Sequence, residues 1–224
     1  MEYTKMSESY LGAKGGSGVY QAIINLMPPH ETYIEAFRGT ATIYSKKAPA
    51  QKSILIDKSQ TTIDKYSYPE AINLCCCAIE FLENFEPENT TLIYCDPPYL
   101  HETRTSNARY EYEMSDEDHA RLIETLKQLP DNVYVILSGY KNSLYHGLLY
   151  DWWSKEFQAM TRGGVRTETV WCNFEPSDIH YHAFAGENFT DRQRIQRKAA
   201  RWANNFKNMP KAEQQAVLAA MLDI

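Results

Sequence analysis

The chain has 224 residues, of which 43% are hydrophobic and 23% are charged, a balance typical of a folded protein. This length allows one domain of ordinary size, or one domain with a small appendage. The longest unbroken apolar run, residues 216–222, is far shorter than the roughly 20 residues of a membrane-spanning helix, which excludes that class of protein. The first ten residues resemble neither a signal peptide nor a transit sequence, so we expect a cytoplasmic protein.

The charges are distributed unevenly along the chain. The formal net charge is -6, but residues 191–211 carry seven basic residues against Asp191 alone, whereas residues 1–190 are strongly acidic. A basic tail of this kind is either a solvated helix face or a contact surface for an anionic partner.

Apolar periodicity predicts an α/β fold in which strands alternate with helices or turns. Predicted strands cover residues 33–37, 53–56, 91–95, 133–137 and 169–173. Predicted helices cover residues 17–27, 69–85, 115–129, 190–207 and 211–222. Capping-box patterns predict the starts of two of these helices, at Ser115 and at Thr190 with Gln193. We expect the tryptophans to lie in the core, at positions Trp152, Trp153, Trp171 and Trp202.

The five cysteines read as reduced thiols. Cys75, Cys76 and Cys77 are consecutive, a spacing that offers neither an easy disulfide nor a C-x-x-C zinc pair. His180 and His182 lack a third soft ligand and indicate a loop. The sequence therefore predicts no metal site.

The most informative segment is the apolar run Thr91–Cys95, which leads directly into Asp96-Pro97-Pro98-Tyr99. Neither proline can donate a hydrogen bond to a sheet, so the strand has to end there. Ligands of open α/β sheets bind outside the carboxyl ends of the strands. We therefore expect Asp96 to lie in a ligand-binding crevice.

Two other strand ends point to the same crevice. The predicted strand over residues 33–37 runs into a turn at Gly39, where backbone amides can approach a ligand. Asp57 follows the next strand, 18 residues after Gly39, close to the spacing at which an acid binds the ribose hydroxyls of a nucleoside cofactor. A glycine-rich loop at residues 10–18 resembles a phosphate cradle, but it lacks the G-x-x-x-x-G-K-[ST] order of a nucleotide triphosphatase.

The ordered set Y-L-G-A-K, Y-I-E-A-F-R-G-T-A, I-L-I-D, D-P-P-Y, L-S-G-Y and V-W-C-N resembles the DPPY-type, Dam-like DNA adenine-N6 methyltransferases, particularly the compact phage and prophage forms. The resemblance covers about residues 10 to 175. It implies a Rossmann-like methyltransferase sheet with helices on both faces, S-adenosylmethionine as methyl donor, and adenine in double-stranded DNA as acceptor.

The resemblance also implies roles for individual residues. Cofactor-binding residues would be Tyr10 and Lys14 at the methionine end, Phe37 and Gly39 along the pocket, and Asp57 at the ribose. Asp96 and Pro97 would accept the two N6 hydrogens of adenine, and Tyr99 would stack on a base that has left the duplex.

Two departures from the family pattern matter for function. Ala41 stands at the second glycine of the usual F-x-G-x-G turn, which is compatible with the turn if its φ angle is negative. Only 38 residues separate Asp57 from Asp96, and we expect the helix that carries the cysteines to fill most of them. This leaves little room for a target-recognition domain, so we expect a short or relaxed recognition sequence.

Two segments are candidates for DNA contact. The polar loop after the D-P-P-Y motif offers side chains that read or stack on bases, namely Arg104, Asn107, Arg109 and Tyr110. The basic tail offers Arg194, Arg197, Lys198 and Arg201. Alternatively, the tail packs an apolar face of Ile195, Ala199, Trp202 and Phe206 against the body. We expect residues 1–189 to form the methyltransferase domain and residues 190–224 a helical tail packed on it.

These observations predict a metal-independent enzyme that methylates adenine N6 in DNA. Two alternatives stay open: a methylase of an RNA base or of a protein glutamine amide, and a DNA-binding protein that keeps the fold but has lost turnover.

Overall fold

The computed structural model describes residues 18–100, 111–161, 164–176, 186 and 188–222. The chain forms two compact units, Met1–His182 and Ala183–Ile224. The division expected from the sequence, after residue 189, stays a prediction.

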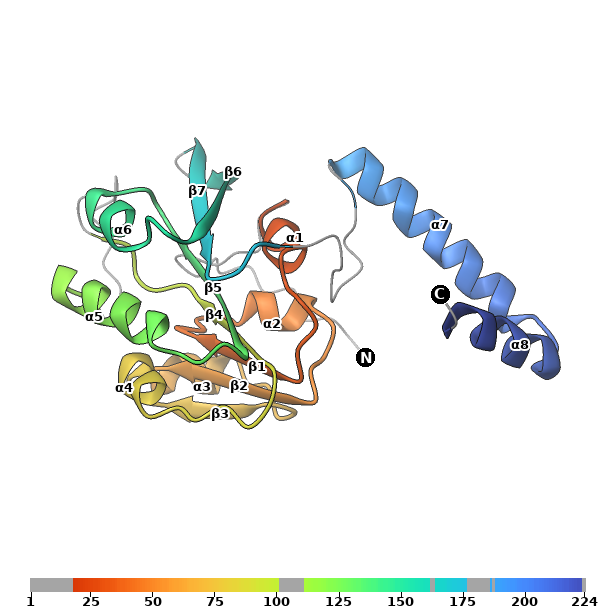
Figure 1. Cartoon of the computed structure of the whole chain (residues 1–224), viewed down its shortest axis with the longest axis horizontal. Helices are drawn as coiled ribbons and strands as arrows, with labels where there is room; N and C mark the ends of the chain where they lie inside the picture. Colours follow the sequence, from red (N-terminus) through yellow and green to blue (C-terminus); the bar gives the residue numbers. More distant parts are fainter. Residues whose placement is uncertain (1–17, 101–110, 162–163, 177–185, 187, 223–224) are drawn as a thin grey trace. The chain divides into compact units, whose positions relative to one another are not determined.

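The first unit contains a seven-stranded sheet with the order β3-β2-β1-β4-β5-β7-β6 (Figure 1). Strands β1 to β5 are parallel, and β7 pairs antiparallel with both β5 and β6. The strands are β1 Thr32–Ala36, β2 Lys52–Asp57, β3 Ile72–Cys75, β4 Thr91–Cys95, β5 Val133–Gly139, β6 Trp153–Thr161 and β7 Gly164–Cys172. The α/β, Rossmann-like fold predicted from the sequence is confirmed.

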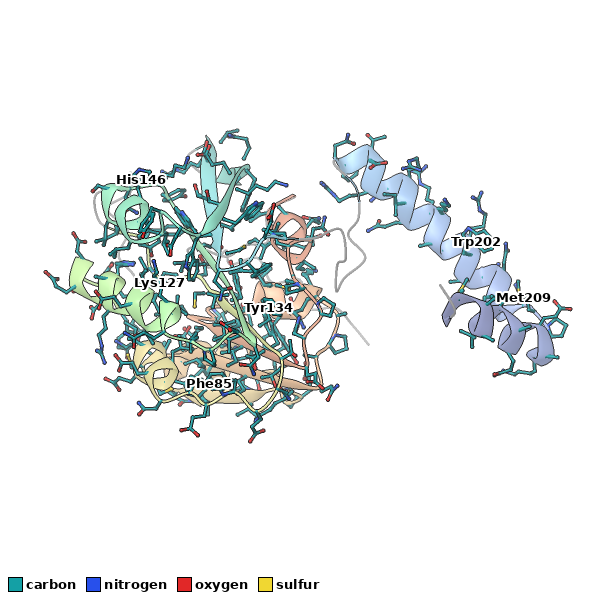
Figure 2. All side chains as sticks on the ribbon, viewed as in Figure 1. Phe85, Lys127, Tyr134, His146, Trp202 and Met209 are labelled. Carbon is teal, nitrogen blue, oxygen red and sulfur yellow. The ribbon has the colours of Figure 1, made fainter. Side chains whose placement is uncertain are left out.

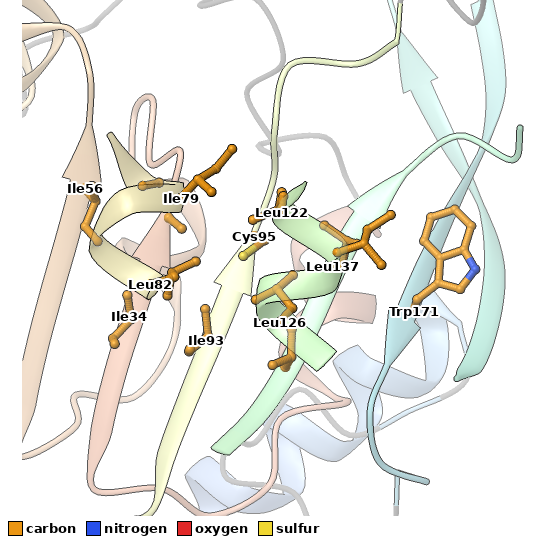
Figure 3. Close-up of a cluster of buried hydrophobic side chains, with 14 of the residues drawn as sticks. Ile34, Ile56, Ile79, Leu82, Ile93, Cys95, Leu122, Leu126, Leu137 and Trp171 are labelled. Atoms are coloured by element: carbon orange, nitrogen blue, oxygen red, sulfur yellow. The ribbon is translucent and has the colours of Figure 1, made fainter. Parts of the chain in front are cut away.

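Helices cover both faces of this sheet. Those of the first unit are α1 Val19–Ile24, α2 Thr42–Lys46, α3 Gln60–Lys65, α4 Ala78–Glu83, α5 Asp116–Lys127 and α6 Ser143–Leu148. Tyr44 of α2 stacks on Tyr33, which points to one face of β1. Helices α4 and α5 cover the opposite face (Figure 3), where Leu82, Leu122 and Leu126 meet the strand residues Ile34 and Ile93. Because successive strand residues point to opposite faces, both layers are built from the same central strands.

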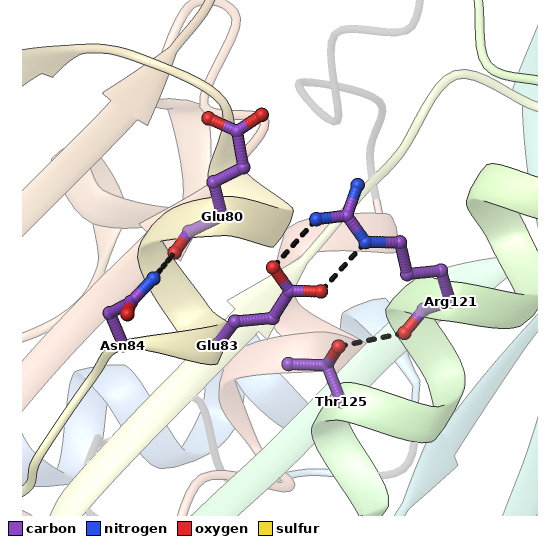
Figure 4. A network of polar contacts seen from close by, with 5 residues as sticks. All are labelled: Glu80, Glu83, Asn84, Arg121 and Thr125. Carbon is purple, nitrogen blue, oxygen red and sulfur yellow. Dashed lines mark hydrogen bonds and ion pairs between the residues drawn. The ribbon is translucent and has the colours of Figure 1, made fainter.

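Polar contacts fix the surface of the α4–α5 layer (Figure 4). The guanidinium of Arg121 donates to both carboxylate oxygens of Glu83 at 2.7 and 2.6 Å. Thr125 Oγ1 donates to the Arg121 carbonyl at 2.8 Å. Both charged partners are solvent-accessible, so this pair orients the two helices more than it stabilises them.

The predicted helix over residues 69–85 is wrong in its first half. Ile72–Cys75 form the edge strand β3, which pairs with β2 through Ile54 and Ile72, and α4 begins only at Ala78. Cys75, Cys76 and Cys77 therefore occupy the end of a strand, a turn and the N-cap of a helix, in that order, and all three are free thiols. The short edge strand has no clear alternation of its own, because its residues are only partly buried.

The capping box predicted at Ser115 is confirmed. Ser115 Oγ accepts from the Asp118 amide at 3.2 Å, and Asp118 Oδ2 accepts from the Ser115 amide at 3.0 Å. The second predicted box is wrong, because α7 (Phe189–Lys207) is capped by Asn188, whose Oδ1 accepts from the Asp191 amide at 3.0 Å. Asn188 is at least as good an N-cap as the threonine that follows it within the helix.

The second unit consists of α7 and α8 (Lys211–Leu222). Gln214 Nε2 donates to the carbonyls of Phe206 and Met209, both at 3.1 Å, and so holds the turn between the two helices. Trp171 of the first unit is buried, but Trp202 projects from α7 (Figure 2) and is 56% exposed, so its expected place in the core is wrong. The described residues of α7 include none that is fully buried.

The turn after β1 has an unusual backbone. Phe37, Gly39 and Ala41 all have positive φ angles, of 60°, 48° and 49°. The condition under which alanine suits this turn, a negative φ angle, is therefore not met at Ala41. A left-handed conformation costs a non-glycine residue roughly 1–2 kcal/mol, so the turn is strained at a position where the family pattern has glycine.

We predict that Ala41→Gly gives a more stable protein than Ala36→Gly. Both alanines are fully buried, so both substitutions lose a buried methyl group and add chain entropy to the unfolded state. Only the Ala41 variant also relieves left-handed strain, which should separate the two unfolding free energies by about 1–2 kcal/mol. Urea denaturation of both variants measures this difference. Equal destabilisation would show that Ala41 carries no strain.

Candidate active site

The candidate site begins where three parallel strands end side by side. The register aligns Ala36 of β1 with Ile56 of β2 and with Cys95 of β4. The residues that follow therefore emerge at the same edge of the sheet, among them Asp57 and Asp96. The Asp96 amide makes a last, long contact of 3.5 Å with the Ala36 carbonyl, and the two prolines then end the ladder.

A hollow that is partly open to solvent lies at this edge, as ligand sites of open α/β sheets do. It is lined by five of the residues predicted from the sequence: Phe37, Gly39, Asp57, Asp96 and Pro97. The prediction that these strand ends form one crevice therefore agrees with the geometry. The other predicted cofactor contacts, Tyr10 and Lys14, lie outside the described residues, as do Arg104, Asn107, Arg109 and Tyr110 of the polar loop.

The carboxylate of Asp57 ties the first two strand ends together. Its Oδ2 accepts from the Gly39 amide and its Oδ1 from the Ser59 amide, both at 2.9 Å. Ser59 caps α3 through Thr62 and also donates from Oγ to Glu111 Oε2 at 2.7 Å. Since a carboxylate oxygen can accept more than one hydrogen bond, Asp57 is held in place and still has lone pairs available for hydroxyl groups.

Glu35 is a further residue of the site that was not predicted from the sequence. It is only 3% exposed, lines the hollow, and accepts through Oε2 from the Tyr33 hydroxyl and the Tyr44 amide, both at 2.8 Å. Burial raises the pKa of Glu35 to about 7, and the neighbouring Asp96 carboxylate also raises it. One signal in the sequence could have indicated this residue: an acid inside an otherwise uncharged, apolar strand. Acids are rarely fully buried without a partner, so such a position suggests a functional group.

Two cations lie near Glu35 and are held by other contacts as well. Burial lowers the pKa of Lys47 to about 8, and its Nζ lies 4.4 Å from the centre of the Tyr33 ring. The buried Arg38 donates to the side chain of Asn73 and to the backbone carbonyl of Tyr66. Glu35 and Arg38, which line the hollow, therefore belong to a network of buried polar groups and aromatic rings, which favours one fixed arrangement.

The chemistry of the lining residues fits S-adenosylmethionine, which carries a sulfonium, an ammonium and one carboxylate group. Two cationic side chains, Arg38 and Lys58, line the hollow together with six carboxyl groups, from Glu35, Asp57, Asp96, Glu111, Glu113 and Asp118. Opposite charges attract strongly in a partly buried site, so this lining favours a cationic ligand and disfavours a phosphate. Phe37, Ile43 and Ile79 add the apolar surface that a nucleoside base needs.

Tyr99 follows the two prolines, and its ring contacts that of Tyr140, with ring centres 4.5 Å apart. Tyr94, two residues before Asp96, is buried and its hydroxyl lies 3.0 Å from Ser138 Oγ. This contact fixes the adjoining ends of β4 and β5 on the face that carries Asp96.

The basic residues predicted on the tail form one stripe along α7. Helical spacing puts them on neighbouring turns of the same side, and each is exposed, in the order Arg194, Arg197, Lys198 and Arg201. Arg194 Nη2 forms an ion pair with Asp191 Oδ1 at 2.7 Å. The stripe is an exposed cationic surface of the second unit, and the alternative in which the tail packs an apolar face against the body stays a prediction.

In the part of the chain that the structure describes, no group of three or more histidine, cysteine, aspartate or glutamate side chains could hold a metal ion. In the same part, no helix has the length and apolar character that crossing a membrane requires.

Comparison with protein families confirms the resemblance stated from the sequence. The family model for D12 class N6 adenine-specific DNA methyltransferases matches residues 58–167. This segment contains Asp96-Pro97-Pro98-Tyr99, and it begins directly after Asp57. The match supports methyl transfer as the activity and S-adenosylmethionine as the cofactor. No curated protein matches the sequence.

Solved structures with a similar fold include spermidine synthase from Thermotoga maritima, at a TM-score of 0.50 and 12% identity, with 80% of this chain and 70% of that chain covered. The N-methyltransferase NodS from Bradyrhizobium japonicum WM9, in complex with S-adenosyl-l-homocysteine, gives 0.49 and 11%, covering 70% and 86%. An rRNA methylase from Streptococcus thermophilus gives 0.46 and 10%, covering 68% and 93%. At 12% identity, the similarity to spermidine synthase shows a shared fold and nothing about activity.

We predict a pH-dependent effect of Glu35→Gln on stability. Glu35 has an ordinary pKa of 4.5 when unfolded and a pKa of about 7 in the folded protein, so its stabilising contribution is complete below pH 4.5 and is lost as the pH rises through 7. The variant keeps an oxygen acceptor but cannot ionise. Its unfolding free energy, relative to the wild type, should therefore increase between these two pH values.

Urea unfolding at several pH values measures this difference. Burial also lowers the pKa of His30 to about 4, but His30 titrates in both proteins and cancels from the comparison. Glu124→Gln, at an exposed position of α5, is the matched control and should give a constant difference. A constant difference for Glu35→Gln as well would contradict the raised pKa.

Proposed function

From the match to the D12 class of N6 adenine-specific DNA methyltransferases, we propose that this protein transfers a methyl group from S-adenosylmethionine to the N6 atom of adenine in DNA. One observation carries the proposal: Asp96 and Pro97 line the same hollow as Gly39 and Asp57. The candidate acceptor groups thus lie in the hollow that contains the candidate cofactor groups.

Adenine N6 is a poor nucleophile because its lone pair is delocalised into the ring. In the proposed mechanism, the Asp96 carboxylate accepts one N6 hydrogen and the Pro97 carbonyl accepts the other. Acceptors fixed in advance stabilise the positive charge that develops on N6, an effect often worth several kcal/mol per group. S-adenosylmethionine, held by Phe37, Gly39 and Asp57, would supply the electrophilic methyl group to N6 and leave as S-adenosylhomocysteine, and the N6 proton accepted by Asp96 would pass on to solvent.

The other residues of the site bind and orient. Phe37 and Gly39 line the cofactor side and Asp57 binds the ribose hydroxyls, while Tyr10 and Lys14 complete the methionine end. Because an adenine inside a duplex cannot reach Asp96, the base leaves the stack and Tyr99 offers it an aromatic face.

The DNA sequence that the enzyme recognises is proposed to be short or loosely specified. The residues between Asp57 and Asp96 form α3, β3, α4 and β4, which belong to the sheet and its cover. Contacts to DNA are assigned to the polar loop, through Arg104, Asn107, Arg109 and Tyr110, and to the basic stripe of α7 defined above. An enzyme that acts on DNA also belongs in the cytoplasm expected from the sequence.

We predict that Asp96→Ala and Asp96→Asn each lower kcat by at least about 100-fold, because each removes a charged acceptor from N6. Binding of S-adenosylmethionine, measured by calorimetry, should change by less than about 10-fold, since its other contacts remain. Asp131→Asn, at an exposed position before β5, is the control and should keep wild-type kcat. Wild-type turnover by either Asp96 variant would exclude the mechanism.

The acceptor is tested by offering methyl-labelled S-adenosylmethionine with DNA, RNA or protein in parallel. The proposal requires label in DNA, recovered as N6-methyladenine by nucleoside mass spectrometry. Label only in RNA or protein would identify one of the alternative methylases. Cofactor binding without transfer to any of the three would identify a protein that keeps the fold without turnover.

The role of the basic stripe is tested by replacing Arg194, Arg197, Lys198 and Arg201 together with glutamine. If they contact phosphates, DNA affinity falls and the slope of log K against log salt becomes less steep, by about 0.9 for each lost contact. Lys52→Gln combined with Lys65→Gln, two solvent-accessible positions of the first unit, is the control. An unchanged slope in the stripe variant would show that α7 does not bind DNA.

A further inference from the structure

Strand topology brings two residues without an assigned role to the edge that carries Asp96. Tyr140 directly follows β5, which is the parallel neighbour of β4. Arg166 lies near the start of β7, and because β7 is antiparallel to β5, its start lies at the carboxyl end of β5. Both residues therefore lie beside β4 in the direction of β5 and β7, whereas the turn that carries Gly39 follows β1, on the other side of β4.

The alternation of side chains puts these residues on the face of Asp96. Tyr94 and Ser138 touch across β4 and β5, so Asp96 and Tyr140, each two residues further along, point the same way. Val170 pairs with Ser138, so their side chains point to the same face of the sheet. Arg166 lies four residues before Val170 on β7 and therefore points to that face too. Trp171 points to the opposite face, into the hydrophobic core.

On that face, three side chains lie in a row, with Tyr140 between the other two. The rings of Tyr99 and Tyr140 have centres 4.5 Å apart and planes inclined by 51°. The guanidinium of Arg166 lies 5.9 Å from the centre of the Tyr140 ring. All three are half-buried, so each has neighbours that limit its movement while one side stays accessible.

We propose that Tyr140 and Arg166 are positioning residues that hold the ring of Tyr99 against the acceptor base. This inference rests on the proposed function, because it assigns a substrate contact to Tyr99. Aromatic pairs of this separation attract one another beyond the area that they bury, and a guanidinium over the second ring adds to that attraction. A ring held in this way loses less entropy when a base stacks on it.

The inference predicts a specific pattern in the kinetics of DNA methylation. Tyr140→Ala should lower kcat/KM for DNA by about 3- to 10-fold, the value of one aromatic pair. Tyr140→Phe keeps the ring and should restore wild-type kcat/KM. Arg166→Gln should lower it by about 2- to 5-fold. KM for S-adenosylmethionine and the melting temperature should stay unchanged in all three variants.

A double-mutant cycle separates action through Tyr99 from any independent effect. If Tyr140 acts by holding Tyr99, then Tyr140→Ala should have almost no further effect in a Tyr99→Ala background. Tyr150→Ala, a tyrosine that is 79% exposed, is the matched control and should behave as wild type.

The outcomes distinguish this inference from the proposed function. A wild-type protein that does not methylate adenine in DNA overturns the function itself. An active wild type whose Tyr140→Ala variant keeps full kcat/KM, or loses activity additively with Tyr99→Ala, overturns the positioning role alone. So does a Tyr140→Phe variant that is as impaired as Tyr140→Ala, or a loss that follows a lowered melting temperature in both Tyr140 variants.

Discussion

The site depends on one constraint, the forced end of β4 between two parallel neighbours. Its five residues are completely or almost completely buried, and β1 and β5 fix its register on both sides. Pro97 and Pro98 cannot extend the ladder, so the chain has to leave the sheet directly after Asp96. A carboxylate is thereby held at the sheet edge by the packing of an entire strand, which is more precise than a loop could achieve on its own.

The charge of this edge shapes how the protein can meet its ligands. The carboxyl groups around Asp57 and Asp96 attract a sulfonium and repel phosphate. An acceptor with a phosphate backbone therefore has to be held from outside the hollow, with only the base entering it. Cations are present in the hollow as well, since Arg38 and Lys58 also line it, while the four basic residues of the stripe belong to the second unit.

The parts of the fold that the sequence predicted are those governed by local rules. Buried parallel strands give continuous apolar runs, and Ser115 carries its own capping pattern, so both were found. The spacing between Gly39 and Asp57 indicated their proximity, which the structure realises as a hydrogen bond. Edge strand β3 was missed because four partly buried residues carry little periodicity, and their strand pairing is decided by β2.

The parts that were missed are decided by tertiary contacts. The positive φ of Ala41 results from the route that the chain takes between β1 and α2, and no local pattern of an alanine indicates it. Tyr140 belonged to a motif that supported the resemblance, but its meeting with Tyr99 and Arg166 depends on the order β4-β5-β7 in the sheet. Side chains that meet across strands acquire a role only when that order is known.

The strained turn and the carboxylate of Asp57 are best understood together. Phe37, Gly39 and Ala41 all have left-handed backbone angles. The strain at the two non-glycine residues persists only where surrounding contacts over-determine the conformation. Asp57 provides one such contact, because its Oδ2 accepts from the amide of Gly39 in the middle of the turn. The side chain expected to bind the cofactor ribose therefore also fixes the backbone that lines the cofactor pocket. Loss of this carboxylate would release the turn as well as the ribose, which couples the shape of the pocket to one of its own binding groups.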